Sequence, residues 1–340
     1  PVQPSPFGRA TEDFLAFVDR LPDRGEPVTP VALLLSSGHA YERVNYSCKM
    51  LHVFPENDAD RELRELFNVC WHPAGVVEGM PAAPDVQSLP NGRYGNIFDV
   101  LVDRPERAKA IFDYPVIWAA GDVNLAPLAK TLEEYVKKGG TLVLTPEGAK
   151  QVTTLAGVMF AGQRKRFDSW VHGPATPYEV ELAKGGETVA EAAAGVPLVV
   201  RNKVGDGAVI TILVPRGLGL DERAHPVLPY LMNGLTAGLM PVEVRLPNGA
   251  RPAGEVMYQV NRTKDGFVVA LFNNRGVDKT QSGVARVDRR QAVEVVVKSS
   301  VPVKSAKEWT DPRDLAVSGG EVRVTVHPGD VQVIGLVARP

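Results

Sequence analysis

The chain has 340 residues, a formal net charge of -2 and a pI near 6.4, and 44% of its residues are hydrophobic. This composition predicts a globular protein with ample core, and the length favours two domains. The charge balance argues against a nucleic-acid partner, because no basic patch is available to neutralise phosphates. No apolar run reaches the roughly 18 residues that a membrane helix needs, so we expect no membrane partner.

The first 150 residues alternate between helical and strand patterns. Residues 11–21 place four apolar side chains at helical spacing, and residues 31–35 (VALLL) form a continuous apolar run, typical of a strand buried on both faces. The other elements expected here are helices over 60–67 and 125–138 and strands over 74–79, 98–103, 115–120 and 141–144. Such alternation predicts a parallel sheet with helices on both faces.

The pattern changes after residue 150. Strands are expected over 178–183, 197–202 and 208–214, followed by an apolar helix over 225–239. From residue 241 onward the sequence reads as short strands separated by turns, which predicts a β-sandwich. We therefore expect an α/β domain over 1–240, with a β insertion over about 157–215, and an all-β sandwich domain over 241–340.

Several segments resemble one known family. Residues 114–145 (YPVIWAAGDVNLAPLAKTLEEYVKKGGTLVLT) resemble the core of the glutamine-amidotransferase-like, or trimerisation, domain of family 42 β-galactosidases. Four further segments are similar to parts of multidomain bacterial glycoside hydrolases: RGEPVTPVALLL, RYGNIFDVL, PLVVRNKVGDGAVITILV and VNRTKDGFVVALFNNRGV. The resemblance implies a flavodoxin-like or class I amidotransferase-like sheet followed by a β-sandwich. It also implies a non-catalytic accessory region and a homo-oligomer, packed on a catalytic (β/α)₈ barrel that lies N-terminal to it or on a sister subunit.

The turn after the last strand of the first half decides whether catalysis is expected. An amidotransferase-type site needs a Cys at this strand-to-helix elbow, with a His and a carboxylate to activate it. The segment 144–148 (LTPEG) has Thr145 at that position, so we predict that the turn is scaffold. A complete glycosidase barrel needs about 250 residues of strand–helix repeats, about twice what is present. We therefore predict no catalytic residue and no cofactor in this chain.

Polar residues near the strand ends are candidates for a ligand site. In open parallel sheets, ligands bind outside the carboxyl ends of the strands. The candidate sugar-binding residues in the loops next to the expected strands are His39, Tyr41, Glu42, Tyr94, Asn96, Asp99 and Asp122. The competing interpretation, which we favour, is that these side chains fix loops or a subunit contact. Trp309, in a polar loop, is a candidate carbohydrate platform, although a structural role is the more common case.

The two cysteines lie near two histidines. Cys48, His52, Cys70 and His72 are residue types that bind zinc, but their spacing is not that of a standard finger. We expect no metal. A zinc site, a Cys48–Cys70 disulfide and two buried thiols remain the alternatives. The cysteine content leaves the compartment open between cytoplasm and periplasm or secretion.

Three functions compete at this point. The first, which we favour, is an accessory and oligomerisation region of a glycoside hydrolase that shapes the mouth of a neighbouring active site. It predicts an exposed apolar patch of several hundred Å². The second is a carbohydrate-binding module that uses the strand-end crevice or the β-sandwich, with carbohydrate as its partner. The third is an independent hydrolase.

Overall fold

The structure is a computed structural model that describes residues 6–21, 23–38, 57–71, 94–252, 256–273, 275–278 and 286–338. It confirms a mixed α/β protein with several sheets. The chain divides into two compact units. The first comprises Pro1–Val28, Cys70–Ile97 and Met240–Pro340, and the second comprises Thr29–Val69 and Phe98–Leu239. Within the described ranges, no helix is both long and apolar enough to cross a membrane.

The second unit is built on a seven-stranded sheet of order β3-β2-β4-β5-β10-β9-β8. Its first five strands run parallel, and the last two run antiparallel to their neighbours. The strands are β2 (Val31–Leu35), β3 (Phe98–Val102), β4 (Val116–Ala119), β5 (Thr141–Leu144), β8 (Glu187–Ala193), β9 (Val196–Val204) and β10 (Gly207–Ile212). β2 and β5 have the bounds predicted from sequence, because each is an apolar run buried at the centre of the sheet.

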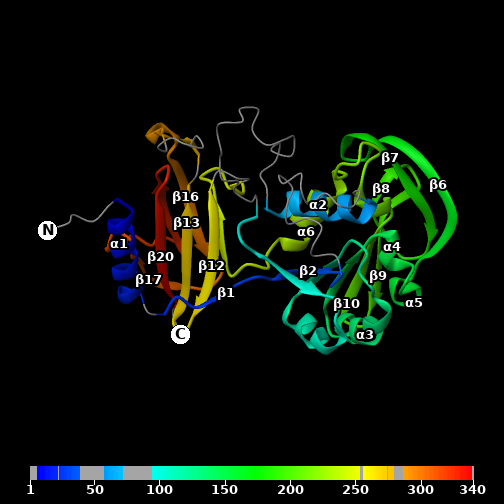
Figure 1. The fold of residues 1–340 in the computed structure, drawn as a ribbon, viewed down its shortest axis with the longest axis horizontal. Helices are drawn as coiled ribbons and strands as arrows, with labels where there is room; N and C mark the ends of the chain where they lie inside the picture. Colours follow the sequence, from blue (N-terminus) through cyan, green and yellow to red (C-terminus); the bar gives the residue numbers. More distant parts are fainter. Residues whose placement is uncertain are drawn as a thin grey trace. The chain divides into compact units, whose positions relative to one another are not determined.

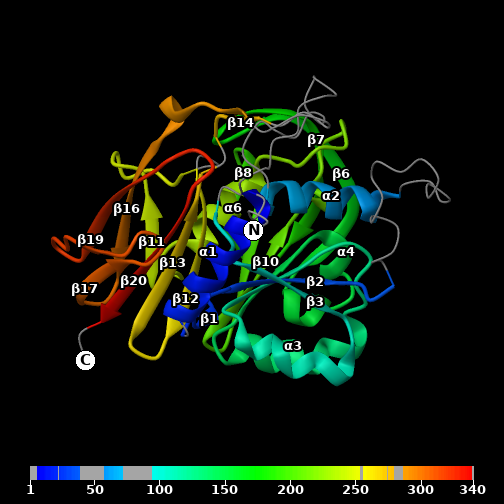
Figure 2. The same cartoon turned by 60° about the vertical axis from the view of Figure 1, so that its left-hand side comes forward.

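Helices cover both faces of this sheet. The views in Figures 1 and 2 place α2 (Asp58–Trp71) and α3 (Ala129–Lys137) on opposite sides of it. The Tyr135 hydroxyl of α3 donates to the carbonyl oxygens of Pro115 and Thr141, which fixes the helix to the amino ends of β4 and β5. The remaining helical segments are η1 (Pro105–Asp113), η2 (Ala126–Leu128), α4 (Pro146–Ala149), α5 (Thr153–Ala156), η3 (Pro215–Gly217) and α6 (Val227–Thr236).

A capping box starts α2. The backbone N–H of Asp60 donates to Asn57 Oδ1 at 2.9 Å, and the N–H of Asn57 donates to Asp60 Oδ2 at 2.8 Å. This reciprocal pair satisfies two backbone donors that a helix start would otherwise leave unbonded. The sequence predicts this helix over 60–67, and the cap explains why it begins earlier.

A long hairpin also belongs to the second unit. β6 (Met159–Trp170) and β7 (Gly173–Lys184) form a two-stranded sheet. The sequence of β6 lacks the alternation of apolar and polar residues by which a strand is normally predicted, and most of its side chains are exposed. This is why the sequence predicts the second half of β7 but misses β6.

The first unit contains a six-stranded antiparallel sheet of order β1-β12-β13-β20-β17-β18 and a three-stranded sheet of order β11-β16-β19. The first sheet comprises β1 (Glu26–Pro27), β12 (Met257–Thr263), β13 (Gly266–Phe272), β17 (Val303–Glu308), β18 (Arg313–Leu315) and β20 (Val331–Ala338). The other strands are β11 (Val242–Arg245), β14 (Val277–Asp278), β15 (Arg286–Val287), β16 (Val293–Ser299) and β19 (Glu321–Val326), and η4 spans Arg289–Gln291.

Helix α1 (Pro6–Arg20) belongs to the first unit and packs on the larger sheet. Phe17 and the adjoining Leu21 contact a cluster that includes Val268 of β13, Val333 of β20 and Trp309. Trp309 therefore packs beneath α1. This is the structural role that the sequence analysis gave as the more common alternative to a carbohydrate platform. The helix starts before the predicted residue 11.

Candidate functional site

The carboxyl ends of the parallel strands form one rim of the seven-stranded sheet, and polar residues line it. Ser37 follows β2, Asp103 follows β3, Asp122 follows β4 and Thr145 follows β5. Two of these loops are joined directly, because Asp103 Oδ1 accepts the N–H of Ser37 at 2.8 Å. In open α/β sheets this rim is where ligands bind, so it is the first place to look for chemistry.

A hydrogen-bonded pair of Glu62 and Arg216 lies on the rim. Glu62 comes from α2 and is only 3% exposed, whereas Arg216 lies in η3, after β10. Arg216 Nη1 donates to Glu62 Oε2 at 3.0 Å and to the carbonyl oxygen of Gly121 at 2.9 Å. Its Nη2 donates to Asp122 Oδ1 at 2.8 Å. One guanidinium therefore joins α2 to the turn after β4.

The backbone of Arg216 is strained to make these contacts. Its φ of 54° and ψ of 6° lie in the left-handed region, which costs a non-glycine residue about 1–2 kcal/mol. In this conformation the Arg216 N–H donates to Glu147 Oε2 at 3.2 Å. Glu62 and Asp122 thus accept from the guanidinium of Arg216, and Glu147 accepts from its backbone N–H. One member of this cluster is more deeply buried than the other two.

Glu62 is that member. Burial raises the pKa of Glu62 to about 8; Arg216 acts in the opposite direction, and the charge of Glu147 adds to the rise. A carboxyl group with such a pKa can act as a general acid or base when a substrate reaches it. Here the two carboxyl oxygens face Arg216 and Thr145, and the side chain is buried. The geometry therefore favours a structural role for the carboxyl group.

Asp103 organises the neighbouring part of the rim. Its Oδ2 accepts the N–H of Asn124 at 2.9 Å, and its Oδ1 accepts the N–H of Ser37. Burial acts to raise the pKa of Asp103, but these hydrogen bonds outweigh it and hold the pKa below its ordinary value. Asp103 is therefore charged at neutral pH. Its two carboxylate oxygens accept hydrogen bonds from the backbones of the loops that hold Ser37 and Asn124.

Thr145 occupies the strand-to-helix elbow between β5 and α4. Its side chain is 3% exposed, and its Oγ1 donates to Glu62 Oε1 at 3.5 Å. A nucleophile at such an elbow must face the substrate and be paired with a base. A buried hydroxyl beside a buried carboxyl group does not meet that requirement. This arrangement suits a scaffold turn, and the absence of catalysis here remains a prediction.

The structure places the predicted ligand residues in different parts of the molecule. Asp122 lies on the rim beside Arg216, whereas Asp99 lies near the amino end of β3, at the opposite edge of the sheet. Asp99 Oδ2 accepts the hydroxyls of Thr29 at 2.5 Å and Tyr114 at 2.9 Å, so it fixes the start of two strands. The sequence predicts that Asp99 and Asp122 both follow a strand and share one crevice. This is wrong for Asp99, which lies inside β3 near its amino end.

The other predicted residues lie elsewhere. Tyr94 and Asn96 belong to the first unit; Tyr94 is buried, with Arg251 over its ring at 5.6 Å. His39, Tyr41 and Glu42 lie outside the described residues. Of the predicted ligand residues that the structure describes, only Asp122 lies in the cluster around Arg216.

Of the four metal-binding candidates, the structure describes Cys70. Its thiol is free and buried, and burial raises the thiol pKa well above its ordinary value. Such a thiol is a poor metal ligand and a poor nucleophile, because both roles need the thiolate. Cys48, His52 and His72 lie outside the described residues. Across the described ranges, no group of three or more His, Cys, Asp or Glu side chains is arranged to hold a metal ion.

Sequence reasoning missed Glu62 and Arg216. One signal was available: Glu62 occupies the same helical stripe as the buried Ala59 and Leu66, and a carboxyl group on a core-facing stripe needs a partner. The partner lies 154 residues away, however, and a single sequence gives no indication of which arginine it is.

A second buried titratable group lies in the second unit. The His225 ring is fully buried, 4.2 Å from the Tyr178 ring and 5.6 Å from the Trp170 ring. Its Nδ1 accepts the N–H of Val227 at 3.1 Å, so the neutral ring carries its proton on Nε2. Burial lowers the pKa of His225 to about 4, and the charge of Asp221 opposes this shift only weakly. The imidazole is therefore neutral at pH 7 and packed among aromatic rings.

No protein-family model matches the sequence, and no curated protein matches it either. Solved structures do match. The chain is similar to a β-galactosidase from Bacillus circulans sp. alkalophilus at 13% identity, over 97% of this chain and 45% of that chain, with a TM-score of 0.51. It is similar to a β-galactosidase from Rahnella sp. R3 at 12% identity, over 97% and 44% of the chains, with a TM-score of 0.54.

A third similar structure is a catalytic mutant of a family 42 β-galactosidase from G. stearothermophilus, at 13% identity, over 98% of this chain and 43% of that chain, with a TM-score of 0.49. The two structures with TM-scores above 0.5 relate the fold of this chain to that of β-galactosidases. The chain spans less than half the length of these proteins.

Proposed function

We propose that this chain is a non-catalytic accessory and oligomerisation region of a multidomain glycoside hydrolase. In this proposal the second unit is the amidotransferase-like domain and the antiparallel sheets of the first unit form the β-sandwich. The observation that carries the proposal is the coverage: 97% of this chain matches 44–45% of each β-galactosidase. A region of that size leaves room for a catalytic barrel of about 250 residues in the whole protein.

The rim of the sheet supports the same proposal. The hydrogen bonds of Arg216 go to Glu62, Gly121, Asp122 and Glu147, so this chain satisfies them internally. In an enzyme the same position needs a reactive side chain that faces a substrate. A buried Thr145 at the elbow provides none, and the network instead holds α2, β4 and η3 in place.

Exposed apolar side chains supply a surface on which a barrel or a second subunit can pack. β3 is an edge strand, and its Val100 and Val102 are 50% and 38% exposed. Phe112 of η1, the segment that follows β3, is also 38% exposed. Contact with a barrel or sister subunit through such residues would bury apolar area and fix the geometry of the assembly.

Two measurements test the proposal. The purified chain is expected to leave p-nitrophenyl β-galactoside and a panel of other p-nitrophenyl glycosides unhydrolysed. Light scattering after gel filtration is expected to show a mass above that of the 36.7 kDa monomer. Hydrolysis that disappears in a Glu62→Gln variant would show instead that the rim is an active site and would overturn the non-catalytic role.

A further inference from the structure

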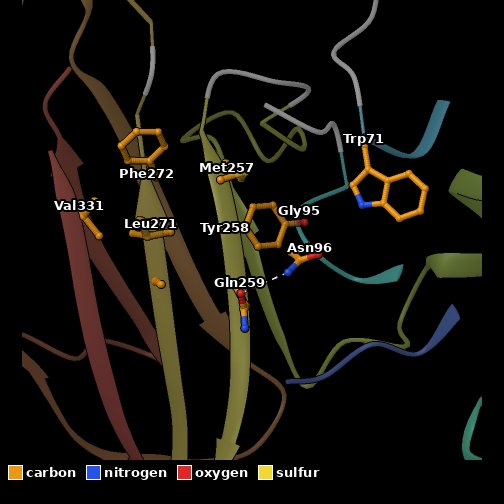
Figure 3. A pocket seen from close by; sticks show the side chains of 10 residues that line it. Trp71, Gly95, Asn96, Met257, Tyr258, Gln259, Leu271, Phe272 and Val331 are labelled. Carbon is orange, nitrogen blue, oxygen red and sulfur yellow. Dashed lines mark hydrogen bonds between the residues drawn. The ribbon is translucent and has the colours of Figure 1, made fainter. Parts of the chain in front are cut away.

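A pocket of about 330 Å³ lies within the first unit, on the six-stranded sheet. The residues that line it include Trp71, Asn96, Met257, Gln259, Phe272 and Val331 (Figure 3). This volume lies at the lower end of the range for small-molecule pockets, which is about 300–1,000 Å³. The pocket is separate from the rim described above, because all of its lining residues belong to the first unit.

The floor of the pocket is one row of apolar side chains across three strands. Met257 of β12 pairs with Phe272 of β13, which pairs with Val331 of β20. Because side chains alternate along a strand, these three point to one face of the sheet. Met257 is 39% exposed and Val331 is 49% exposed, so the row is open to solvent at both ends. It offers an apolar surface on one face of the sheet.

The side-chain amides of Asn96 and Gln259 line one wall and belong to a chain of hydrogen bonds. Asn96 Nδ2 donates to Gln259 Oε1 at 3.2 Å, and Gln259 Nε2 donates to Asn261 Oδ1 at 2.9 Å. Asn261 Nδ2 donates in turn to the carbonyl oxygen of Arg24 at 2.8 Å. These bonds use one N–H of each amide. A second N–H on Asn96 and on Gln259, and the Asn96 carbonyl oxygen, provide both donors and acceptors beside the apolar row.

The wall is held rigidly against the sheet. The Asn96 N–H donates to the carbonyl oxygen of Tyr258 at 2.7 Å. Gly95 has a φ of 75°, and a Cβ at that position would lie 2.5 Å from the Tyr258 ring. Only glycine allows the segment to approach so closely, and Figure 3 shows Asn96 beside Gln259 as a result. A preformed site of this kind loses little entropy when it binds a ligand.

The lining indicates the chemistry of the ligand. The described residues around the pocket carry no charge, so a charged ligand would lose its hydration without gaining a partner. An apolar floor beside paired amide donors and acceptors fits a molecule with a C–H face and a hydroxyl edge, and aromatic groups such as Phe272 and Trp71 suit the C–H face. We propose that this pocket binds an uncharged sugar of one or two rings. The proposal does not depend on the accessory role.

The test uses the full chain with ¹³C-labelled methionine methyl groups and lactose as the probe. The Met257 methyl resonance, assigned through Met257→Leu, is expected to shift on titration with lactose. Gln259→Leu is expected to weaken binding about tenfold, the loss expected for one or two hydrogen bonds. Asn96→Ala, which keeps the backbone bond to Tyr258, is expected to act in the same direction. Gln163→Leu changes an exposed amide on β6 and is expected to leave binding unchanged.

Three results would overturn the proposal. The first is a Met257 resonance that stays in place with lactose, cellobiose and maltose. The second is equal lactose affinity in Gln259→Leu, Asn96→Ala and Gln163→Leu, all of them folded as judged by thermal unfolding. The third is a shift of Met257 with indole but not with the sugars, which would identify the pocket as a site for an apolar partner.

Discussion

Arg216 Nη1 lies 3.0 Å from Glu62 Oε2 at the carboxyl edge of the seven-stranded sheet. The ion pair joins α2 to the turn after β10, and the same guanidinium reaches Gly121 and Asp122 after β4. In a working α/β enzyme this edge carries the reactive groups. Here Glu62 and Arg216 bond to each other and to neighbouring turns, and we expect the stability of the second unit to depend on this pair.

Glu62→Ala should lower the free energy of unfolding by about 1–3 kcal/mol, because it removes a buried side chain and one hydrogen-bond acceptor of Arg216, which keeps Gly121 and Asp122 as partners. Urea denaturation measures the change. The matched control is Glu133→Ala, which removes an exposed pair with Lys137 on α3 and should cost less than about 1 kcal/mol. Equal losses in the two variants would contradict a structural role for the Glu62–Arg216 pair.

The pH dependence of stability carries a contribution from Glu62. Its pKa is about 8 in the folded protein and has its ordinary value of 4.5 in the unfolded chain. Between these values the folded state binds more protons, so the Glu62 contribution to the free energy of unfolding falls as pH rises. Glu62→Gln should remove this fall, and urea titrations from pH 5 to 8 would show it. A variant with the same slope as the parent chain would contradict the raised pKa.

His225 contributes a slope of opposite sign. Its pKa is about 4 in the folded protein against 6.5 in the unfolded chain, so the unfolded state binds more protons between these values. Stability from this group is complete above pH 6.5 and is lost as pH falls toward 4, by up to about 1.4 kcal/mol per pH unit. His225→Gln should flatten this acid limb. An acid limb of unchanged slope in His225→Gln would contradict the lowered pKa of His225.

The two slopes oppose each other between pH 4.5 and pH 6.5. The parent chain should therefore show a flatter stability profile over this window than either single variant. A His225→Gln variant exposes the Glu62 slope, and a Glu62→Gln variant exposes the His225 slope. The double variant should be flat again, because the two groups are distinct titrating sites. A parent profile steeper than both single variants would contradict the opposite signs.

Local sequence patterns predict many of the helices and strands, whereas the candidate site is formed by contacts between residues that lie far apart in the sequence. Val31–Leu35 and Thr141–Leu144 are strands at the expected bounds because buried apolar runs are a local signal. β6 has mostly exposed side chains and gives no such signal. Asp122 is predictable as a residue after a strand, whereas its partner Arg216 depends on a turn 94 residues later. The pocket row of Met257, Phe272 and Val331 depends on strand register, which the sequence alone does not define.

The exposed edge strand β3 makes the proposed oligomerisation testable. Val100→Asp and Val102→Asp together place two charges on the outer face of β3, where both valines are more than one-third exposed. If β3 lies in a subunit contact, desolvating these charges should shift the mass measured by light scattering toward the monomer, with little change in thermal unfolding.

Val171→Asp is the matched control, because Val171 is also exposed but lies between β6 and β7. It should leave the mass unchanged. A parent chain that is monomeric at every concentration would contradict the oligomerisation role itself. An oligomer that persists in the double variant and dissociates in Val171→Asp would move the contact from β3 to the β6–β7 hairpin, in which most side chains of β6 are exposed.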